Sequence, residues 1–253
     1  MSESGAMGKQ PAYLACLTTL NQARLDPSVN CLGKLRVALA IFDLDETLIA
    51  GDSDHAWGEF MIERGLVTAD HRAQNDAFYA QYKRGELDAD DYFRFACAAL
   101  APHDMVLLEA ARQDFVEQMI MPLMLDKAEQ LIEKHRQAGD KLLVITATLE
   151  FVTAPIVARL GINDLIAPIA ERINDRYTGE LAGVPSFGVG KVTRLMAWLV
   201  GTPFSLQGSH FYSDSANDLP LLELVDHPVA VDPDPRLRDI AERRQWPIIS
   251  LRD

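Results

Sequence analysis

Six apolar residues, 37–42, run without interruption up to the acidic Asp43. A continuous apolar run, rather than an alternation, is typical of a strand buried on both faces of a parallel sheet. Shorter apolar runs between segments of helical periodicity predict further strands over 142–145, 210–212, 229–231 and 248–249. The periodic segments predict helices over 125–138, 151–160, 191–200 and 219–224. A hairpin is predicted over 172–181, with its turn at Asn174-Asp175.

A second pattern occupies the stretch from residue 52 to about 121. Aromatic and apolar side chains recur there at helical spacing, and Gly65, Gly85 and Pro102 predict the breaks between helices. Strand–helix units that alternate around one helical insert predict an α/β fold with a doubly wound parallel sheet. The predicted division is 35–50 and 123–253 for the core and 51–122 for the helical insert.

The composition, with 48% hydrophobic and 24% charged residues in 253, suits a globular protein. Its 24 basic and 37 acidic side chains leave a formal net charge of −13, which argues against a nucleic-acid or anionic-membrane partner. No apolar run approaches the ~18 residues that a membrane helix needs. Cys16, Cys31 and Cys97 are widely spaced and odd in number, which favours neither a disulfide framework nor a zinc site. We therefore expect a cytoplasmic protein, and the chain carries no signal for its oligomeric state.

Residues 1–34 precede the first predicted strand and match none of these patterns. The Leu-Ala-Cys sequence that ends at Cys16 resembles a lipoprotein cleavage box, but Lys9 is the one basic residue before it and Thr18 interrupts the apolar stretch. Secretory signals have a charged start and a continuous apolar core. We expect a loosely attached N-terminal extension, or the product of an upstream start codon.

Two aspartates, Asp43 and Asp45, directly follow the first predicted strand. Open α/β sheets bind ligands beyond the carboxyl ends of their strands, so both acids are placed for chemistry. A carboxylate can act as a covalent nucleophile, and a second carboxyl group can protonate a leaving alkoxide and later deprotonate water. Helix capping or turn formation is the alternative, because Asp is common in both.

Two later segments offer contacts for a phosphate. Thr146 ends the second predicted strand, and its hydroxyl with the backbone N–H groups that follow, from Ala147 on, could hold a phosphate oxygen. The alternative is that Thr146 or Thr148 caps the next helix. Lys191 begins a predicted helix after a glycine-containing run and could bridge a nucleophile and a phosphate. The alternative for Lys191 is a solvated surface lysine.

A second pair of acids, Asp214 and Asp218, follows the strand at 210–212. Acids at two strand ends form an oxygen-rich site that suits Mg²⁺. Capping by Asp214 or Ser215 is the alternative, but it does not explain why acids gather at both ends.

Together, the segments FDLDET, LLVITAT, Gly190-Lys191 and YSDSAND resemble, in order, the motifs of the haloacid dehalogenase (HAD) superfamily. The resemblance covers about residues 35–231. It implies a Rossmann-like core with a C1-type cap formed by the insert, and the DSAND run is similar to the phosphoserine-phosphatase branch, subfamily IB. It also implies a Mg²⁺-dependent phosphomonoester hydrolase that acts on a small polar metabolite through an aspartyl-phosphate.

The resemblance also implies roles for individual residues. Asp43 would be the nucleophile and Asp45 the general acid/base, and Asp45 favours a phosphatase because the dehalogenases of the superfamily lack it. Mg²⁺ would be held by Asp43, the backbone carbonyl of Asp45, and Asp214, with Asp218 in support through water. The phosphoryl group would contact Thr146, Ala147, Lys191 and Asn217.

Substrate selection is expected in the cap. In phosphoserine phosphatases an acid soon after the first motif holds the substrate amine and a cap arginine holds its carboxylate; Asp52 and Arg94 occupy those positions here. Asp52 is one methylene shorter than the family's glutamate. The alternatives are an N-cap for Asp52, and for Arg94 an ion pair with Asp90 or Asp91.

Residues 51–55, followed by Trp57, are also similar to a bacterial subgroup associated with histidinol-phosphate phosphatase activity. That substrate has an amine and an imidazole but no carboxylate, so Asp52 or Asp54 would serve the amine. The ring would lie against an aromatic side chain: Trp57, Tyr79 or Tyr82. Histidinol phosphate and phosphoserine are the two expected substrates.

Other readings of the same motifs stay open. A phosphotransferase or mutase of the superfamily would pass the phosphoryl group to an acceptor alcohol, and a lipid-phosphate phosphatase would need an apolar membrane-facing helix. A phospho-acceptor receiver domain also uses Asp, Thr/Ser and Lys around Mg²⁺. Receivers are about half this length, lack the helical insert and have no role for Asp45.

Overall fold

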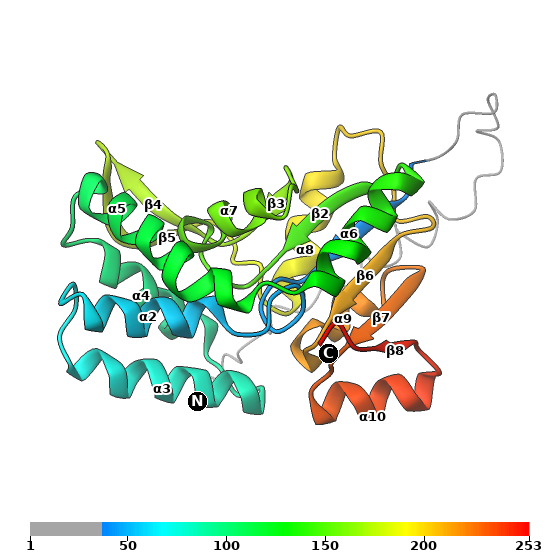
Figure 1. The fold of residues 1–253 in the computed structure, drawn as a ribbon, viewed down its shortest axis with the longest axis horizontal. Helices are drawn as coiled ribbons and strands as arrows, with labels where there is room; N and C mark the ends of the chain where they lie inside the picture. The colour runs from blue at the N-terminus through cyan, green and yellow to red at the C-terminus, as the bar shows by residue number, and fades with distance from the viewer. Residues whose placement is uncertain (1–36, 253) are drawn as a thin grey trace, which may run out of the picture. The chain divides into compact units, whose positions relative to one another are not determined.

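A six-stranded parallel sheet is the centre of the part of the chain that the computed structural model describes, residues 37–252 (Figure 1). In spatial order the strands are β3 (Leu165–Ile166), β2 (Lys141–Ile145), β1 (Leu39–Phe42), β6 (His210–Ser213), β7 (His227–Val231) and β8 (Ile248–Ile249). Every neighbouring pair is parallel, which confirms the predicted sheet. The extension predicted at residues 1–34 lies outside the described residues.

The strand order reverses on the two sides of β1. The chain runs from β1 to β2 and β3 on one side, and then returns to add β6, β7 and β8 on the other. Phe42 pairs with Val144 of β2 and with Tyr212 of β6, so Asp43 follows at the edge where both neighbouring strands end. Open α/β sheets bind their ligands in the crevice at such a reversal.

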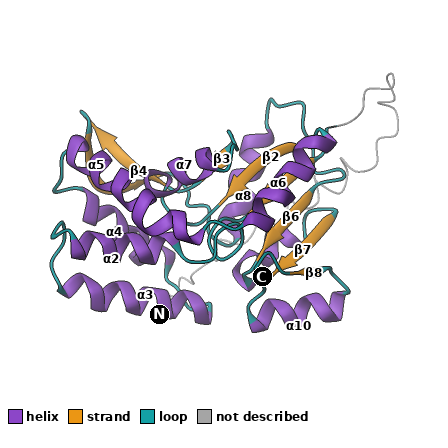
Figure 2. Ribbon diagram, in the orientation of Figure 1, coloured by secondary structure: helices purple, strands orange, loops and turns teal. Residues whose placement is uncertain are grey.

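β1 is buried on both faces, as its uninterrupted apolar run predicts. Ala40 and Phe42 belong to one hydrophobic cluster, and Leu39 and Ile41 belong to the other. The first cluster includes residues of α6 (Asp126–Ala138) and α7 (Glu150–Arg159). The second includes residues of α8 (Val189–Leu199), α9 (Leu219–Leu222) and α10 (Pro235–Arg244). Helices therefore cover both faces of the sheet, as Figure 2 shows.

Four helices between β1 and α6 form the cap. They are α2 (Ser53–Glu63), α3 (Asp70–Arg84), α4 (Ala89–Leu100) and α5 (Met105–Phe115), followed by short helical turns η1 (Val116–Ile120) and η2 (Met121–Leu123). The predicted breaks at Gly65, Gly85 and Pro102 fall between these helices. A bridge between Ile49 and Met124 closes the base of the insert. The domain boundaries at 50/51 and 122/123 stay predictions, because residues 37–252 form one compact unit.

An aromatic cluster connects the cap to the core. The ring of Trp57 in α2 meets that of Phe115 in α5 edge-on, with centroids 5.2 Å apart. It meets Phe151 of α7 in the same way at 5.7 Å. Such edge-to-face contacts add to the stabilisation that burial provides. The hydrophobic cluster on this face of the sheet therefore continues into the cap.

The hairpin predicted over 172–181 is confirmed as β4 (Ile169–Ile173) and β5 (Arg176–Ala182). Asn174 and Asp175 make the turn with φ angles of 49° and 59°, a left-handed conformation that Asn and Asp tolerate better than most residues. β5 packs along α4. The hairpin is therefore a second contact between the core and the cap.

The patterns above predicted neither β3 nor α10. β3 has two residues, too few to show a period. α10 has a start signal: Asp234 accepts a hydrogen bond from Leu237 N at 2.8 Å, and Pro235 is the first helical residue. An Asp-Pro pair ahead of a helical apolar stripe is a recognisable N-terminus, and it was missed.

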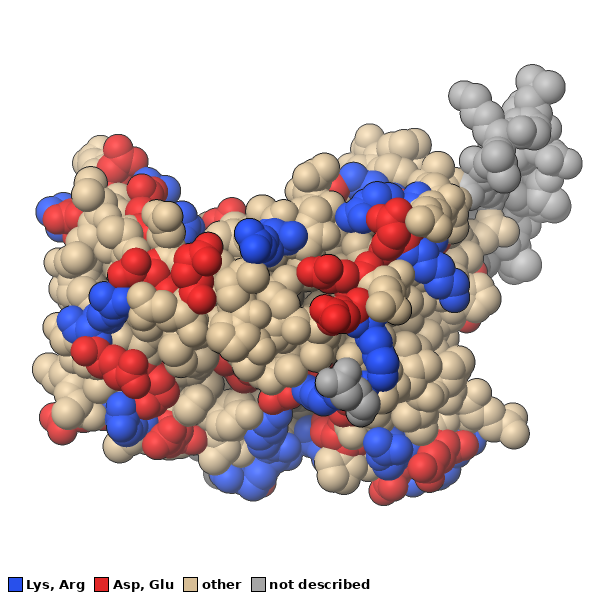
Figure 3. All heavy atoms as spheres, viewed as in Figure 1, with Lys and Arg blue, Asp and Glu red and all other residues tan. Residues whose placement is uncertain are grey.

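Acidic and basic side chains are interspersed on the face drawn in Figure 3. The acidic side chains visible on this face are spread over it rather than gathered in one patch. Within residues 37–252, no helix has the length and apolar character needed to cross a membrane.

A proline inside α7 leaves one helix carbonyl for the cap to satisfy. Pro155 has no N–H, so it cannot donate to the carbonyl of Phe151 four residues earlier. Arg112 of α5 donates to that carbonyl instead, with Nη1 at 3.0 Å, and its guanidinium lies 4.6 Å from the centroid of the Phe151 ring. The hydrogen bond and the ring contact hold α5 against α7.

Replacing Arg112 by Met keeps much of the side-chain volume but leaves the Phe151 carbonyl without its donor. We expect the free energy of unfolding to fall by about 1–3 kcal/mol, the cost of an unsatisfied acceptor at a partly buried position. Arg159→Met, at the exposed end of α7, is the control and should change it by less than about 0.5 kcal/mol. Urea unfolding measures both variants, and equal losses would contradict the role given to Arg112.

Candidate active site

Lys191 is the central group of the site. Its Nζ donates to Asp43 Oδ1 at 2.8 Å and to Asp218 Oδ2 at 2.7 Å, and all three side chains are buried. Asp43 follows β1, Asp218 ends the short helical turn η3 (Ala216–Asp218) after β6, and Lys191 lies in the first turn of α8. The fold thus brings together three of the four predicted chemical segments at one edge of the sheet.

Close packing against Pro185 determines where α8 begins, and with it the position of Lys191. Gly190 lies so close to the carbonyl of Pro185 that an added Cβ would be 2.0 Å from its oxygen. No side chain fits there, so glycine before Lys191 is a packing requirement. Lys191 N donates to the carbonyl of Gly188 at 3.1 Å as the helix starts, and its side chain reaches the end of β1.

Burial makes the charges of this group costly. It raises the pKa of Asp43 to about 7, opposed by the charge of Lys191 and increased further by that of Asp218. Burial alone would lower the pKa of Lys191, but Asp218 and Asp43 raise it above its usual value. The ammonium therefore stays charged at neutral pH.

Asp214 adds a third carboxylate at the end of β6. Thr47 holds it: Asp214 N donates to Thr47 Oγ1 at 3.1 Å, and the same hydroxyl donates to Asp214 Oδ1 at 3.3 Å. Burial, followed by Asp43 and Asp218, raises the pKa of Asp214 well above its usual value. Three buried carboxylates beside one ammonium leave negative charge at oxygen ligands, which fits a hard cation such as Mg²⁺.

Asp45 lies beside this group, and its two oxygens have different donors. Ser53 N donates to Oδ1 at 2.7 Å, and Thr148 Oγ1 donates to Oδ2 at 2.8 Å. Thr146 Oγ1 is 3.4 Å from Oδ2. Burial, followed by the charge of Asp52, raises the pKa of Asp45 to about 6, while the donors at Ser53 and Thr148 lower it. A carboxyl group with such a pKa can both give and take a proton near neutral pH.

Thr146, Ala147 and Thr148, which follow β2, all line the same pocket as Asp45. The N-cap of α7 is Leu149, and no side chain caps this helix, so the capping alternative for Thr146 and Thr148 is wrong. Thr148 was not predicted as a site residue. Its signal was a second hydroxyl two residues after Thr146, which sequence reasoning assigned to capping alone.

This pocket is lined from both the core and the cap. The core contributes Asp43, Asp45, Thr146, Ala147, Thr148 and Phe187. The cap contributes Asp52, Asp54, His55, Asn75, Phe78, Tyr79, Tyr82, Leu87, Tyr92 and Phe93. Of the lysines and arginines between residues 37 and 252, none is among the lining residues. The cap wall is therefore acidic and aromatic.

Asp52 and Asp54 flank the start of α2. Asp52 is the N-cap, since its Oδ1 accepts from Asp54 N at 3.1 Å and from His55 N at 2.9 Å. It therefore both caps the helix and lines the pocket. Burial, followed by Asp54, raises the pKa of Asp52 to about 6. Asp54 accepts a hydrogen bond from the Tyr92 hydroxyl, yet burial still raises its pKa to about 6.

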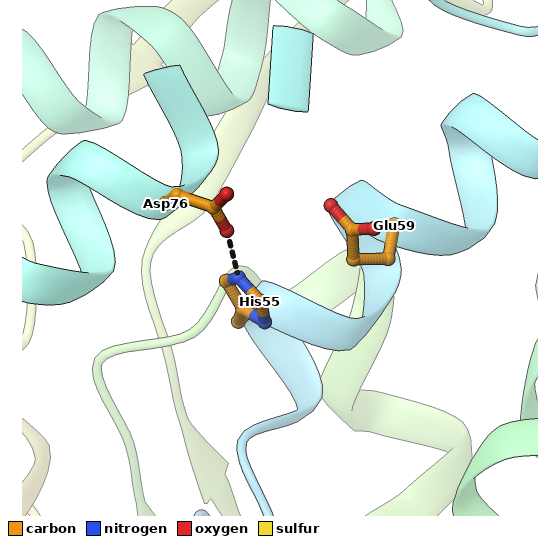
Figure 4. A group of neighbouring side chains, drawn as sticks. All are labelled: His55, Glu59 and Asp76. Carbon is orange, nitrogen blue, oxygen red and sulfur yellow. Dashed lines mark hydrogen bonds and ion pairs between the residues drawn. The ribbon is translucent and has the colours of Figure 1, made fainter. Parts of the chain in front are cut away.

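His55 is held between α2 and α3. Its Nε2 lies 2.9 Å from Asp76 Oδ1, and its ring packs on that of Tyr79 with centroids 4.6 Å apart. Figure 4 shows Asp76 reaching from α3 to His55, with Glu59 one turn further along α2. His55, Glu59 and Asp76 each offer a metal-ligand atom within 4.8 Å of the others. However, both acids already have partners: Glu59 pairs with Arg72 at 2.8 Å, and Asp76 pairs with His55. The second of these contacts supports the His55 ring.

Trp57, one of the three aromatic residues expected beside a substrate ring, is buried in the cluster between cap and core and does not line the pocket. The other two, Tyr79 and Tyr82, do line it. His55 and Trp57 are two residues apart on α2 and therefore point in different directions. His55 lines the pocket, and Trp57 packs into the aromatic cluster.

Five other predicted site residues lie outside the pocket lining: Lys191, Asp214 and Asp218, which belong to the buried group described above, and Arg94 and Asn217. Arg94 is exposed on α4 and pairs with Asp91 at 2.8 Å, so the ion-pair alternative describes it and the carboxylate clamp has no support. Asn217 connects core and cap: its Nδ2 donates to the carbonyl of Tyr82 at 3.3 Å, and Arg236 Nη2 donates to its Oδ1 at 3.4 Å. The phosphoryl contact of Asn217 stays a prediction.

Comparison with known proteins shows which family this chain is similar to. Residues 40–223 match the family of haloacid dehalogenase-like hydrolases. A histidinol-phosphatase of Neisseria meningitidis serogroup C is 43% identical over 219 residues, 85% of this chain and 99% of that protein. The phosphoserine phosphatase SerB1 of Mycobacterium tuberculosis is 32% identical over 85% of this chain and 71% of its own length. A crystal structure of a Bordetella pertussis protein of unknown function is 42% identical with a TM-score of 0.81, over 85% of this chain and 99% of that one.

Asp54→Asn tests the cost of an acid in this pocket. The pKa of Asp54 is about 6 in the folded protein against an ordinary 3.8, so the folded state holds this proton more tightly than the unfolded state. The stabilisation that the protonated Asp54 gives to the folded state is fully present below about pH 4. It is lost as the pH rises through 6. Asn can still accept from Tyr92 and carries no charge. Above pH 7 the variant should be more stable than the wild type by about 3 kcal/mol, and near pH 4 the two should be nearly equal.

Urea unfolding of Asp54→Asn and the wild type between pH 4 and pH 8 measures this difference. Asp239→Asn, an exposed acid on α10, is the control and should show no such trend. A stability advantage of Asp54→Asn that grows toward acid pH would contradict the account.

Proposed function

The chain belongs to the haloacid dehalogenase-like hydrolase family, and we propose that it hydrolyses a small phosphomonoester through an aspartyl-phosphate on Asp43. The observation that carries this proposal is the buried contact of Lys191 with Asp43 and Asp218 at the end of β1. A carboxylate can attack phosphorus only if its repulsion from the phosphoryl oxygens is offset, and the ammonium of Lys191 offsets it.

The reaction has two steps. In the first, an oxygen of Asp43 bonds to phosphorus, the ester P–O bond breaks, and Asp45 gives a proton to the departing alcohol oxygen. In the second, Asp45 takes a proton from a water molecule whose oxygen bonds to phosphorus, and the bond between phosphorus and Asp43 breaks. The pKa of Asp45, about 6, suits both directions of proton transfer. Thr146, whose Oγ1 is 3.4 Å from Asp45 Oδ2, and the N–H of Ala147, which lines the same pocket, would orient the phosphoryl oxygens.

The carboxylates of this site also fit Mg²⁺. Asp43, Asp214 and the backbone carbonyl of Asp45 would hold the ion, with Asp218 in support; carboxylate and carbonyl oxygens are its usual protein ligands. When bound, Mg²⁺ neutralises charge on the transferring phosphoryl group.

The cap wall favours a substrate that bears an amine and no carboxylate. Asp52 and Asp54 place two carboxylates on the pocket, and His55 and Tyr79 add a pair of rings in tilted contact. Each acid with a raised pKa gains from a nearby cation and would be opposed by a further anion. Histidinol phosphate has a phosphate, an amine and an imidazole ring, and the Neisseria meningitidis relative is named for its hydrolysis. We propose histidinol phosphate as the substrate.

Phosphoserine is the second candidate, because the Mycobacterium tuberculosis relative carries the name phosphoserine phosphatase. Its carboxylate needs a basic partner, and Arg94, the residue expected to supply one, is exposed and paired with Asp91. We therefore propose phosphoserine as a poorer substrate than histidinol phosphate.

Phosphate release with Mg²⁺ tests the substrate directly. We expect kcat/KM for histidinol phosphate to exceed that for phosphoserine by at least about tenfold, since one misplaced or unpaired charge costs about 1.5–3 kcal/mol. Asp54→Asn should raise KM for histidinol phosphate by about 10–100-fold and leave the hydrolysis of 4-nitrophenyl phosphate, which has no amine, within a few-fold of the wild type.

Arg94→Ala is the matched control for the two candidates. Because Arg94 lies outside the pocket, its removal should leave kcat/KM unchanged for both substrates. A loss confined to phosphoserine would show that Arg94 holds the carboxylate, and would contradict the substrate proposed here.

A further inference from the structure

We infer that Thr148 is a positioning residue that aims the carboxyl group of Asp45 at the oxygen of the leaving alcohol. The inference rests on the proposed function, since it assigns to Thr148 a part in the proton transfer of the first step. Its basis is the hydrogen bond from Thr148 Oγ1 to Asp45 Oδ2, 2.8 Å long and formed by a threonine that is 4% exposed.

The two oxygens of Asp45 are held from two directions. Ser53, the first residue of α2, donates its backbone N–H to Oδ1 at 2.7 Å. Thr148, on the loop after β2, donates its hydroxyl to Oδ2 at 2.8 Å. Two short bonds to different oxygens fix the rotation of the carboxyl group about its terminal torsion, which is otherwise broad. The contact of Thr146 Oγ1 with Oδ2 at 3.4 Å is too long to replace that of Thr148.

The donor types also assign the transferable proton to one oxygen. A backbone N–H can only donate, so Oδ1 is an acceptor in every protonation state of Asp45. The proton that Asp45 gives to the leaving group is therefore carried on Oδ2, the oxygen that Thr148 holds. A hydroxyl suits this place because it donates to Oδ2 of the carboxylate and can turn away when Oδ2 carries the proton, which is then free to go to the leaving alcohol.

Other roles for Thr148 lack support. Its hydroxyl does not cap α7, whose N-cap is Leu149 without a side-chain bond. Its backbone N–H donates to Thr146 Oγ1 at 3.2 Å, a bond that any residue type except proline can make at 148. The hydroxyl itself is thus needed at Asp45 and not for the local backbone.

A wrongly oriented general acid lowers the rate of hydrolysis of some substrates more than that of others. An alkyl phosphate releases a poor leaving group and depends on a proton from Asp45, whereas 4-nitrophenyl phosphate releases a good one and does not. General-acid assistance is worth about 10²–10⁴ in rate. Thr148→Val keeps the shape of the side chain and removes its hydroxyl. We expect it to lower kcat/KM for histidinol phosphate about 100-fold and for 4-nitrophenyl phosphate less than about tenfold.

Two further variants separate positioning from packing. Thr148→Ser restores the hydroxyl and should bring kcat/KM for the alkyl phosphate back to within a few-fold of the wild type. Thr153→Val is the matched control, because Thr153 is an equally buried threonine whose hydroxyl donates to the Leu149 carbonyl at 3.1 Å. It should leave the ratio of the two substrates unchanged.

Steady-state rates on both substrates, with thermal melts to confirm folding, decide the question. A selective loss in Thr148→Val, rescued by Ser, supports the role. Equal losses on both substrates would overturn it, because they indicate a role in phosphate binding or packing, and so would a serine variant that stays slow. A wild type without phosphatase activity would instead overturn the proposed function, and this inference with it.

Discussion

The ammonium of Lys191 lies between Asp43 and Asp218 in a buried site, and the surrounding groups are arranged about that charge. Removing one partner from such a group leaves an unpaired buried charge and typically costs 3–5 kcal/mol. The contact requires β1 and β6 to be neighbours, so that their following acids meet, and it requires a glycine at 190 that allows α8 to begin against Pro185. Even so, burial raises the pKa of Asp43 to about 7, and the charge of Lys191 offsets only part of that rise.

The cap takes part in this arrangement through Asp45. One of its oxygens accepts from Ser53, where the cap begins, and the other from Thr148 of the core, so the proposed acid/base lies at the junction of the two. The cap also supplies Asp52 and Asp54, which line the pocket and carry the proposed preference for a cation. Chemistry at phosphorus and choice of substrate are thereby assigned to different walls of one pocket.

The sequence predicted the fold well, and it predicted that the acids after β1 and β6 meet at one edge of the sheet, because both depend on short-range patterns. The run before Asp43 has the composition of a doubly buried strand, and acids at strand ends must meet at one edge of a parallel sheet. The cap side chains were harder. Whether Arg94 or Trp57 faces the pocket depends on the rotation of each helix about its axis, which long-range packing sets. Thr148 was assigned to capping because its true partner is 103 positions away in sequence.

The central claim is that Asp43 carries the phosphoryl group during turnover. A single turnover of histidinol phosphate, quenched in acid within the lifetime of the intermediate and digested for mass spectrometry, tests it most directly. We predict phosphate on the peptide that contains Asp43, and its absence when Asp43→Asn is treated in the same way. Hydrolysis by the wild type with no phosphate on this peptide at any quench time, or with phosphate on another residue, would contradict the account.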